Sequence, residues 1–238
     1  MNAPTPPLSR RRFTAGTAAT VFTLPAAGLL ASSPAWALSS QDAARGVLAA
    51  LEKGVGAAVD LLGRADGFLG DAAVRIEPPK PLQKALKLLS RLGQGERGEQ
   101  LVQALNRAAE AAVPEARDLL VQAVRGMKLQ DAVQLVRGPD NAATAFFERQ
   151  TRTPLAQRFL PIVTQATQQV ALAERYNAVA SRASHMGLVK AEDAQLESYV
   201  TQKALDGLFK KVADQERQIR QDPVGTGSDL LKLVFGRG

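Results

Sequence analysis

Apolar residues recur every three or four positions along most of the chain after residue 40, the spacing of helices that bury one face. From Ser40 to Gly63 the spacing is regular and ends at a glycine, and it recurs over the longer stretch 194–220. No segment alternates between apolar and polar residues with a period of two, so strands are not expected. The pattern predicts an all-α fold, an irregular bundle of roughly eight helices of unequal length.

Glycine and proline separate the predicted helices. A Gly-Asp link at 64–70 and a proline-fixed connector at 76–81 follow the first helix. The glycines between 93 and 98 predict a break between a short helix at 82–92 and the next one. Pro114 either kinks that next helix or opens another at its first turn. The remaining pattern predicts helices at 129–136, at 141–150, from Pro154 through Ala173, at 194–220 and at 229–235, with a loop at 181–193.

The first 37 residues have the order of a twin-arginine export signal. Ser9-Arg10-Arg11-Arg12-Phe13 precedes an apolar run that extends to about Leu30, and Ala35-Trp36-Ala37 supplies a small-x-small cleavage site. Arg10 and Arg11 are therefore the predicted export residues, and Ala35 and Ala37 the predicted cleavage residues. This reading makes 1–37 a signal peptide and 38–238 a single helical domain. It implies a periplasmic location and the Tat translocase as a partner during export.

Composition narrows the possible chemistry. The signal segment holds three arginines and no acidic residue, so the net charge falls from +7 for the whole chain to +4 for the remainder. That value gives no reason to expect nucleic acid as a partner. The chain has no cysteine and one histidine, His185, which excludes disulfides, thiolate metal sites and iron–sulfur clusters. No cofactor and no metal are expected.

The short helix after the proline connector separates leucine from positive charge. At about 100° per residue, its leucines share one face (Leu82, Leu86, Leu89 and Leu92, with Ala85), and its cations share the opposite face (Lys80, Lys84, Lys87 and Arg91). A leucine face opposed by a purely basic face is typical of helices that lie on anionic membranes. The alternative is an ordinary surface helix with leucines in the core and lysines in water.

Several polar residues fall on or beside apolar stripes. Asn106 and Glu110 flank one such stripe, Asn177 lies on another, and Glu216 and Arg220 lie near a third. A buried polar group is costly unless it is hydrogen-bonded. These five residues therefore either form a polar network within the core or line a ligand site.

No catalytic motif stands out. The chain lacks G-x-S-x-G, H-E-x-x-H, a Walker loop and a dinucleotide fingerprint. A cofactor-free enzyme would have to rely on carboxylates, for which Glu110, Asp206 and Glu216 are the candidates. Asp206 also suits a simple surface ion pair with Lys203 or Lys210.

Several stretches resemble an exported bacterial helical family that is catalogued as domain of unknown function 4197. The likeness is strongest at 199–209 (YVTQKALDGLF) and also involves 66–69, 106–110 with Val113-Pro114, 142–147, 219–223 and 229–236. The resemblance implies a helical fold and an exported protein, and it assigns no activity.

These observations favour a non-enzymatic binding or interaction module whose helices cradle an apolar ligand or a partner helix. A peripheral membrane protein that uses the helix 82–92 is the second hypothesis, with an anionic membrane surface as the partner. An envelope protein is a further possible partner. A carboxylate-dependent enzyme is the third hypothesis.

Overall fold

The computed structural model describes residues 40–128, 130–131, 134–135, 138–168, 171–187 and 194–222. The chain divides into two compact units, 1–37 and 38–238, and every described residue belongs to the second. The predicted export signal and the predicted helix 229–235 lie outside the described residues, and half of the predicted helix 129–136 does too.

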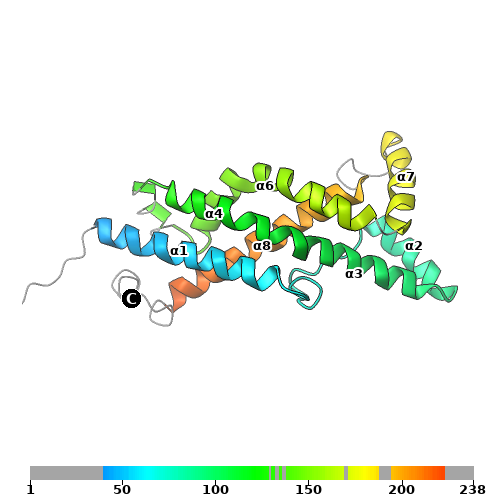
Figure 1. Ribbon diagram of the computed structural model, residues 1–238, viewed down its shortest axis with the longest axis horizontal. Coiled ribbons are helices and arrows are strands. Elements are labelled where there is room, and N and C mark those ends of the chain that lie inside the picture. Colours follow the sequence, from blue (N-terminus) through cyan, green and yellow to red (C-terminus); the bar gives the residue numbers. More distant parts are fainter. Residues whose placement is uncertain are drawn as a thin grey trace, which may run out of the picture. The chain divides into compact units, whose positions relative to one another are not determined.

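The all-α prediction is confirmed. Seven α-helices and one 3-10 helix are defined within the described residues (Figure 1); roughly eight helices were expected for the whole chain. Their bounds are α1 Ser40–Leu62, α2 Lys80–Arg91, α3 Gly95–Ala112, the 3-10 helix η1 Val113–Glu115, α4 Ala116–Arg125, α6 Ala142–Gln168, α7 Ala171–His185 and α8 Leu196–Gln221.

The first helix, α1, behaves as its sequence pattern predicts. Its buried residues Leu51, Val55, Val59 and Leu62 repeat every three or four positions, and the helix ends just before Gly63. It packs against α8 and α4. Just past its middle it meets the end of α8, where a Cβ added to Gly54 would lie 3.2 Å from Ile219 Cδ1.

The break predicted between 93 and 98 is shorter than expected. Because α3 begins at Gly95, two of the three glycines are helical, and only Gly93, with φ +77°, takes the left-handed turn. Gly98 instead lets α3 approach α2: a Cβ there would lie 3.3 Å from Leu86 Cδ2. At the other end of α3, Pro114 lies in the single 3-10 turn that joins α3 to α4, and the two helices follow one another along one line (Figure 1).

The helix predicted at 141–150 and most of the one predicted from Pro154 through Ala173 form one helix, α6, which contains both Pro154 and Pro161. The prediction was wrong at its end, because α6 stops at Gln168 and Ala173 belongs to α7. An interior proline removes a helix hydrogen bond, which is why the sequence indicated a break. Burial offsets that cost: Phe147, Leu155, Phe159 and Val163 are fully buried. Buried positions come every four residues, so they rotate by about 40° per step around the helix. That rotation lets α6 pack against α8, α3 and α4.

The predicted loop at 181–193 was wrong in its first part. Residues up to His185 continue α7, and Gly187, with φ +73°, follows that helix. The helix predicted from Ala194 is confirmed as α8, which begins at Leu196.

The link after α1 enters the core. Phe68 is fully buried and its ring lies against Gly207 in the middle of α8. A Cβ at Gly207 would sit 2.7 Å from Phe68 Cε1, so the glycine is needed for this close approach. The neighbour of this mid-helix glycine is thus a turn and not another helix.

Candidate functional site

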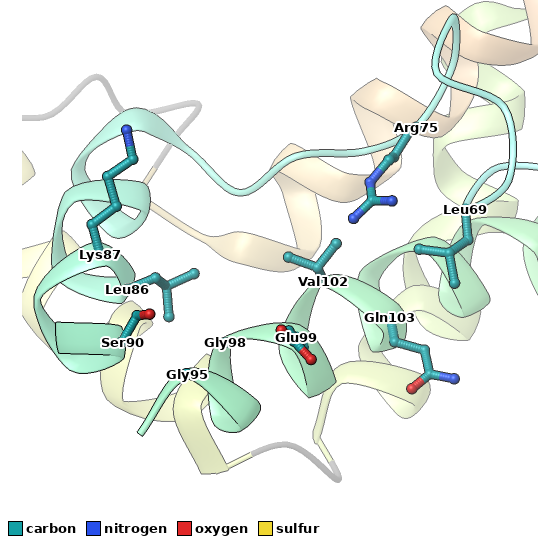
Figure 2. Close-up of a pocket in the computed structure, with 10 residues that line it drawn as sticks. All are labelled: Leu69, Arg75, Leu86, Lys87, Ser90, Gly95, Gly98, Glu99, Val102 and Gln103. Carbon is teal, nitrogen blue, oxygen red and sulfur yellow. The ribbon is translucent and has the colours of Figure 1, made fainter. Parts of the chain in front are cut away.

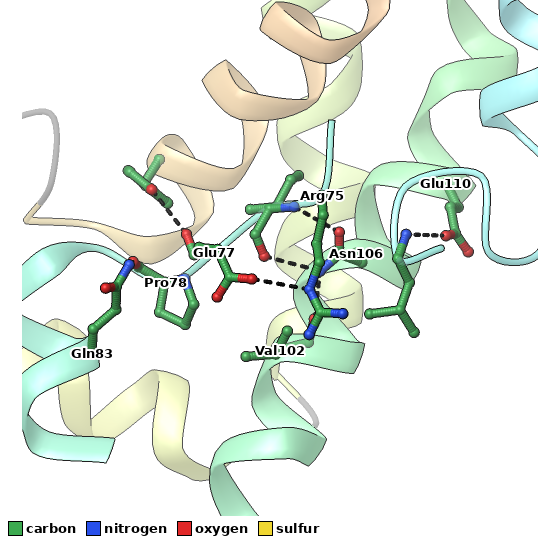
Figure 3. A network of polar contacts seen from close by, with 10 residues as sticks. Arg75, Glu77, Pro78, Gln83, Val102, Asn106 and Glu110 are labelled. Carbon is green, nitrogen blue, oxygen red and sulfur yellow. Dashed lines mark hydrogen bonds and ion pairs between the residues drawn. The ribbon is translucent and has the colours of Figure 1, made fainter. Parts of the chain in front are cut away.

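The whole segment between α1 and α2, residues 63–79, is called the connector below. A buried amide side chain on α3 holds it in place. Asn106 is fully buried, and its Oδ1 accepts the Ile76 N–H at 2.8 Å. Its Nδ2 donates to the carbonyls of Ile76 and Val102 at 3.0 and 2.8 Å (Figure 3). The side chain thus pairs with Ile76 as a neighbouring strand would. All three of these hydrogen bonds are made within the protein, which satisfies the buried amide.

One turn further along α3, Glu110 holds the turn that contains Phe68. Its Oε1 accepts the N–H groups of Phe68 and Leu69 at 3.0 and 3.2 Å. Its Oε2 accepts from Arg107 at 2.6 Å, and Arg107 also reaches Asp66 at 2.9 Å. The hydrogen bond to Glu110 is the main cause that raises the pKa of Arg107. Asp66 is the one non-glycine residue with positive φ in the described part of the chain.

The buried carboxylate of Glu216 caps α6. It accepts the N–H groups of Ala143 and Thr144 at 3.1 and 2.9 Å and the Thr144 hydroxyl at 2.8 Å. A negative charge at a helix N-terminus also complements the helix dipole. Arg220 lies one turn beyond, 2.9 Å from Glu216 Oε1 and 2.8 Å from the Leu135 carbonyl.

Asn177, which lies in α7, caps the N-terminus of α8. Its Oδ1 accepts the Leu196 N–H at 2.8 Å, at the first residue of α8. Its Nδ2 donates to both carboxylate oxygens of Glu197 at 2.9 and 2.8 Å. Sequence reasoning missed Glu197, because an acidic residue in the first turn of a helix is unremarkable.

The five predicted polar residues therefore belong to separate networks. Asn106 and Glu110 both hold the connector, Glu216 and Arg220 close the start of α6, and Asn177 closes the start of α8. Each is hydrogen-bonded to backbone or ion-paired within the protein. These contacts correspond to the core-network alternative of the sequence analysis, and they do not bring the five residues into one cavity.

The third candidate carboxylate, Asp206, and the single histidine, His185, do not belong to these networks. Asp206 is exposed and lies 3.3 Å from Lys203, one of the two ion-pair partners that the sequence suggested. Its shorter ion pair, 2.5 Å to Arg152, was not expected from the sequence. His185 is exposed at the end of α7. Across the described residues there is no group of three or more His, Asp or Glu side chains that could hold a metal ion.

The two faces predicted for α2 agree with the observed exposure of its side chains except at Leu92. Lys80, Lys84, Lys87 and Arg91 are exposed, as expected. Leu82 is buried, and Leu86 and Leu89 are half-buried. However, Leu92, expected on the inward face, is 74% exposed, and Leu88 is 59% exposed. The reason is that α2 ends at Arg91, and Leu92 occupies the C-cap just before the turn at Gly93.

A groove opens between α2, α3 and the connector (Figure 2). Its volume is about 580 Å³. Leu86 and Val102 face each other across it, and the guanidinium of Arg75 reaches in from the connector. The groove is lined by Leu69, Arg75, Leu86, Lys87, Ser90, Gly95, Gly98, Glu99, Val102 and Gln103.

Sequence reasoning missed this groove, because it interpreted the glycines at 93–98 only as a break between two helices. Gly95 and Gly98 are part of the wall, where the absence of side chains leaves room beside α2. A glycine pair in the first turn of α3, next to an amphipathic helix, was the available signal.

Comparison with known proteins gives a family. The model for the family described as "Protein of unknown function (DUF4197)" matches residues 37–236. The chain belongs to the DUF4197 family. No curated protein and no solved structure matches it. The DUF4197 match includes α2, the groove and all the polar networks described above, so these features lie within the family's domain.

None of the helices in the described part of this DUF4197 protein has the length and apolar character needed to span a membrane.

Proposed function

We propose that this DUF4197 protein is an exported, non-enzymatic binding protein whose ligand site is the groove between α2 and α3. The observation that carries the proposal is the groove itself: an apolar wall of Leu69, Leu86 and Val102 stands beside two cations, Arg75 and Lys87. Pockets for small ligands combine apolar lining with a few polar groups that fix orientation.

The charges of the groove favour an anionic amphiphile. The Nε of Arg75 donates to Glu77 at 3.0 Å, while its terminal NH₂ groups point toward Val102 (Figure 2). A guanidinium has five N–H donors, so Arg75 can keep Glu77 and bind a carboxylate or phosphate as well. Lys87 adds a second cation and Glu99 one acid. An apolar chain with an anionic head fits this lining.

The hydrogen bonds of the candidate carboxylates support binding over catalysis. Glu110 and Glu216 are buried acceptors for backbone N–H groups, and Asp206 is an exposed ion-pair partner. A general acid or base needs a position within reach of a substrate proton, and the hydrogen bonds of these carboxylates instead hold turns and helix ends.

Mass spectrometry under native conditions tests the groove. The full-length chain is incubated with decanoate, and separately with decylammonium as the probe of opposite charge. Decanoate is expected to bind. Val102→Phe places a ring in the groove and is expected to lower decanoate occupancy at least tenfold. Gln100→Phe adds the same ring to an exposed position of α3 outside the groove and is expected to leave occupancy unchanged.

The proposal is wrong if decanoate does not bind, or if Val102→Phe and Gln100→Phe bind it equally. Preference for decylammonium would overturn the anionic assignment. Circular dichroism of both variants identifies any loss of folding.

The export part of the proposal rests on the sequence of the N-terminus. The twin-arginine motif with Arg10 and Arg11, and the cleavage site with Ala35 and Ala37, support export by the Tat pathway to the periplasm. Replacing Arg10 and Arg11 with lysine is expected to retain the protein in the cytoplasm, measured by cell fractionation. Undiminished export of this variant would refute the assignment.

A further inference from the structure

We propose that the outer face of α2 docks on the surface of an anionic lipid bilayer. This face consists of Lys80, Lys84, Lys87, Leu88 and Arg91, with Leu92 at the C-cap. The proposal is independent of the groove, which lies on the side of α2 that faces α3, although Lys87 borders both.

The two exposed leucines lie along one edge of the cationic face rather than opposite it. At about 100° per residue, Leu92 lies about 40° to one side of Leu88, and Lys84 and Arg91 lie about 40° and 60° to the other side. Leu88 is 59% and Leu92 is 74% exposed. Large exposed hydrophobic side chains are few in the described residues, namely Leu88, Leu92, Leu160 and Met186. Two of these four therefore stand at one end of α2.

The charge on this face has one sign. The sequence of α2, KPLQKALKLLSR, contains no acidic residue. Its four cations are all exposed, and lysine and arginine can extend their charged ends while their stems cover apolar surface. Leucines beside a cationic face bury a little apolar area in a bilayer, and the cations add attraction to anionic headgroups.

A bilayer fits this face better than a folded protein partner does. A stable protein interface buries upwards of about 1,000 Å² and depends on aromatic or arginine anchors in well-packed pockets. Here the apolar part is two leucines at a helix end, and α2 has no aromatic residue. Two leucines can insert shallowly into a bilayer, and the cations beside them can bind its headgroups, without any complementary pocket.

Co-sedimentation with vesicles tests the proposal, using the full-length chain. Vesicles of phosphatidylglycerol and phosphatidylcholine are compared with vesicles of phosphatidylcholine alone. Stronger binding to the anionic vesicles, weakening as salt rises from 50 to 500 mM, is expected because salt screens exposed charges. The apolar N-terminal run is common to all variants, so differences between variants report on α2.

Two variants separate the contributions of charge and leucine. Lys80→Gln, Lys84→Gln and Arg91→Gln together spare Lys87 and the groove. Each basic residue near an anionic surface strengthens binding about fivefold, so this variant is expected to bind about a hundredfold more weakly. Leu88→Gln with Leu92→Gln keeps the charge and is expected to weaken binding at least tenfold.

A charge-matched control comes from exposed cations elsewhere. Lys128→Gln, Arg149→Gln and Arg158→Gln remove the same charge from other positions, and binding is expected to stay within about twofold of wild type. Equal loss in the control and in the α2 charge variant would overturn the proposal, since binding would then follow net charge alone. Equal binding to anionic and neutral vesicles would also overturn it. An unaffected leucine variant would contradict the insertion of Leu88 and Leu92.

The groove proposal has its own readout. Loss of decanoate binding in Val102→Phe does not depend on vesicles, and the α2 charge variant retains both Arg75 and Lys87. Either proposal can therefore fail while the other stands.

Discussion

The connector 63–79 and the helix that follows it, α2, both lie against α3, but they are held there by different means. Backbone N–H groups of the connector donate to Asn106 and Glu110 on α3. From α8, the Tyr199 hydroxyl and Lys210 donate to carbonyls of the connector. The inner face of α2 meets α3 through leucines, and no side chain caps its N-terminus. The buried polar side chains serve the connector, while exposed leucines and unbalanced charge gather on α2.

The largest effect on stability is expected when the ring that anchors the connector, Phe68, is removed. Phe68→Ala empties a fully buried site against Gly207 and is expected to lower the free energy of unfolding by about 3–5 kcal/mol. Gly207→Ala is expected to cost about 1–3 kcal/mol, because its Cβ displaces the ring.

Urea unfolding of the double variant makes this test specific. With Phe68 already reduced to alanine, the added Cβ at position 207 meets no ring, so Gly207→Ala loses most of its cost. Strict additivity of the two changes would show that the two residues do not interact.

The second test concerns the hydrogen bonds of the connector. Glu110→Ala leaves the N–H groups of Phe68 and Leu69 without their acceptor, and the expected loss is about 2–4 kcal/mol. Glu99→Ala, at an exposed position of the same helix, is expected to stay within about 0.5 kcal/mol. Chemical denaturation measures both, and similar values for the two would contradict a clamping role for Glu110.

The third test compares the two faces of α2. Leu82→Ala removes a buried side chain and is expected to cost about 2–3 kcal/mol. Leu88→Ala removes an exposed one and is expected to change stability by less than about 0.5 kcal/mol. Thermal unfolding distinguishes them, and a large loss for Leu88→Ala would mean that this leucine serves the fold rather than a surface.

The smallest expected effect is the pH dependence of stability that comes from Asp71. Asp71 follows the Phe68 turn, and its hydrogen bond from Lys211 at 2.5 Å is the main cause that lowers its pKa below the ordinary 3.8. Because the folded pKa is the lower one, the contribution is fully present above about pH 5, well above the unfolded value, and is lost as pH falls through the folded value.

Asp71→Asn is therefore expected to cost less than about 1 kcal/mol at pH 6. It is also expected to flatten the loss of stability between pH 5 and pH 3. An unchanged pH profile in this variant would contradict the assigned role of Asp71.

Local spacing made the all-α fold and most helices predictable. α1 and α8 keep regular apolar spacing and end near glycine or polar residues, so their limits follow from neighbours in sequence. α6 was divided wrongly, because Pro154 and Pro161 indicate breaks and its buried positions drift around the helix. Only packing against three other helices explains why it stays continuous.

The polar candidates were predictable as unusual positions but not as specific contacts. Glu216 binds N–H groups 72 and 73 positions away, and Asn106 binds Ile76, 30 positions away. Their partners are mostly backbone groups, which every residue carries and which leave no mark in the sequence. The groove was missed for a related reason, since its space arises from two helices that approach at Gly98.

The contact between α1 and α8 has a consequence for how the chain folds during synthesis. α1 is translated before every other described helix and α8 after them, yet Ala50 and Ile219 form a buried apolar pair, and Gly54 lies beside that pair. Until α8 has left the ribosome, this side of α1 has no native partner, and such long-range contacts form slowly. The side of α1 that packs against α8 therefore stays without its native cover until translation is nearly complete, while its other side can already pack against α4, and exposed apolar surface of this kind is where a partly folded chain aggregates.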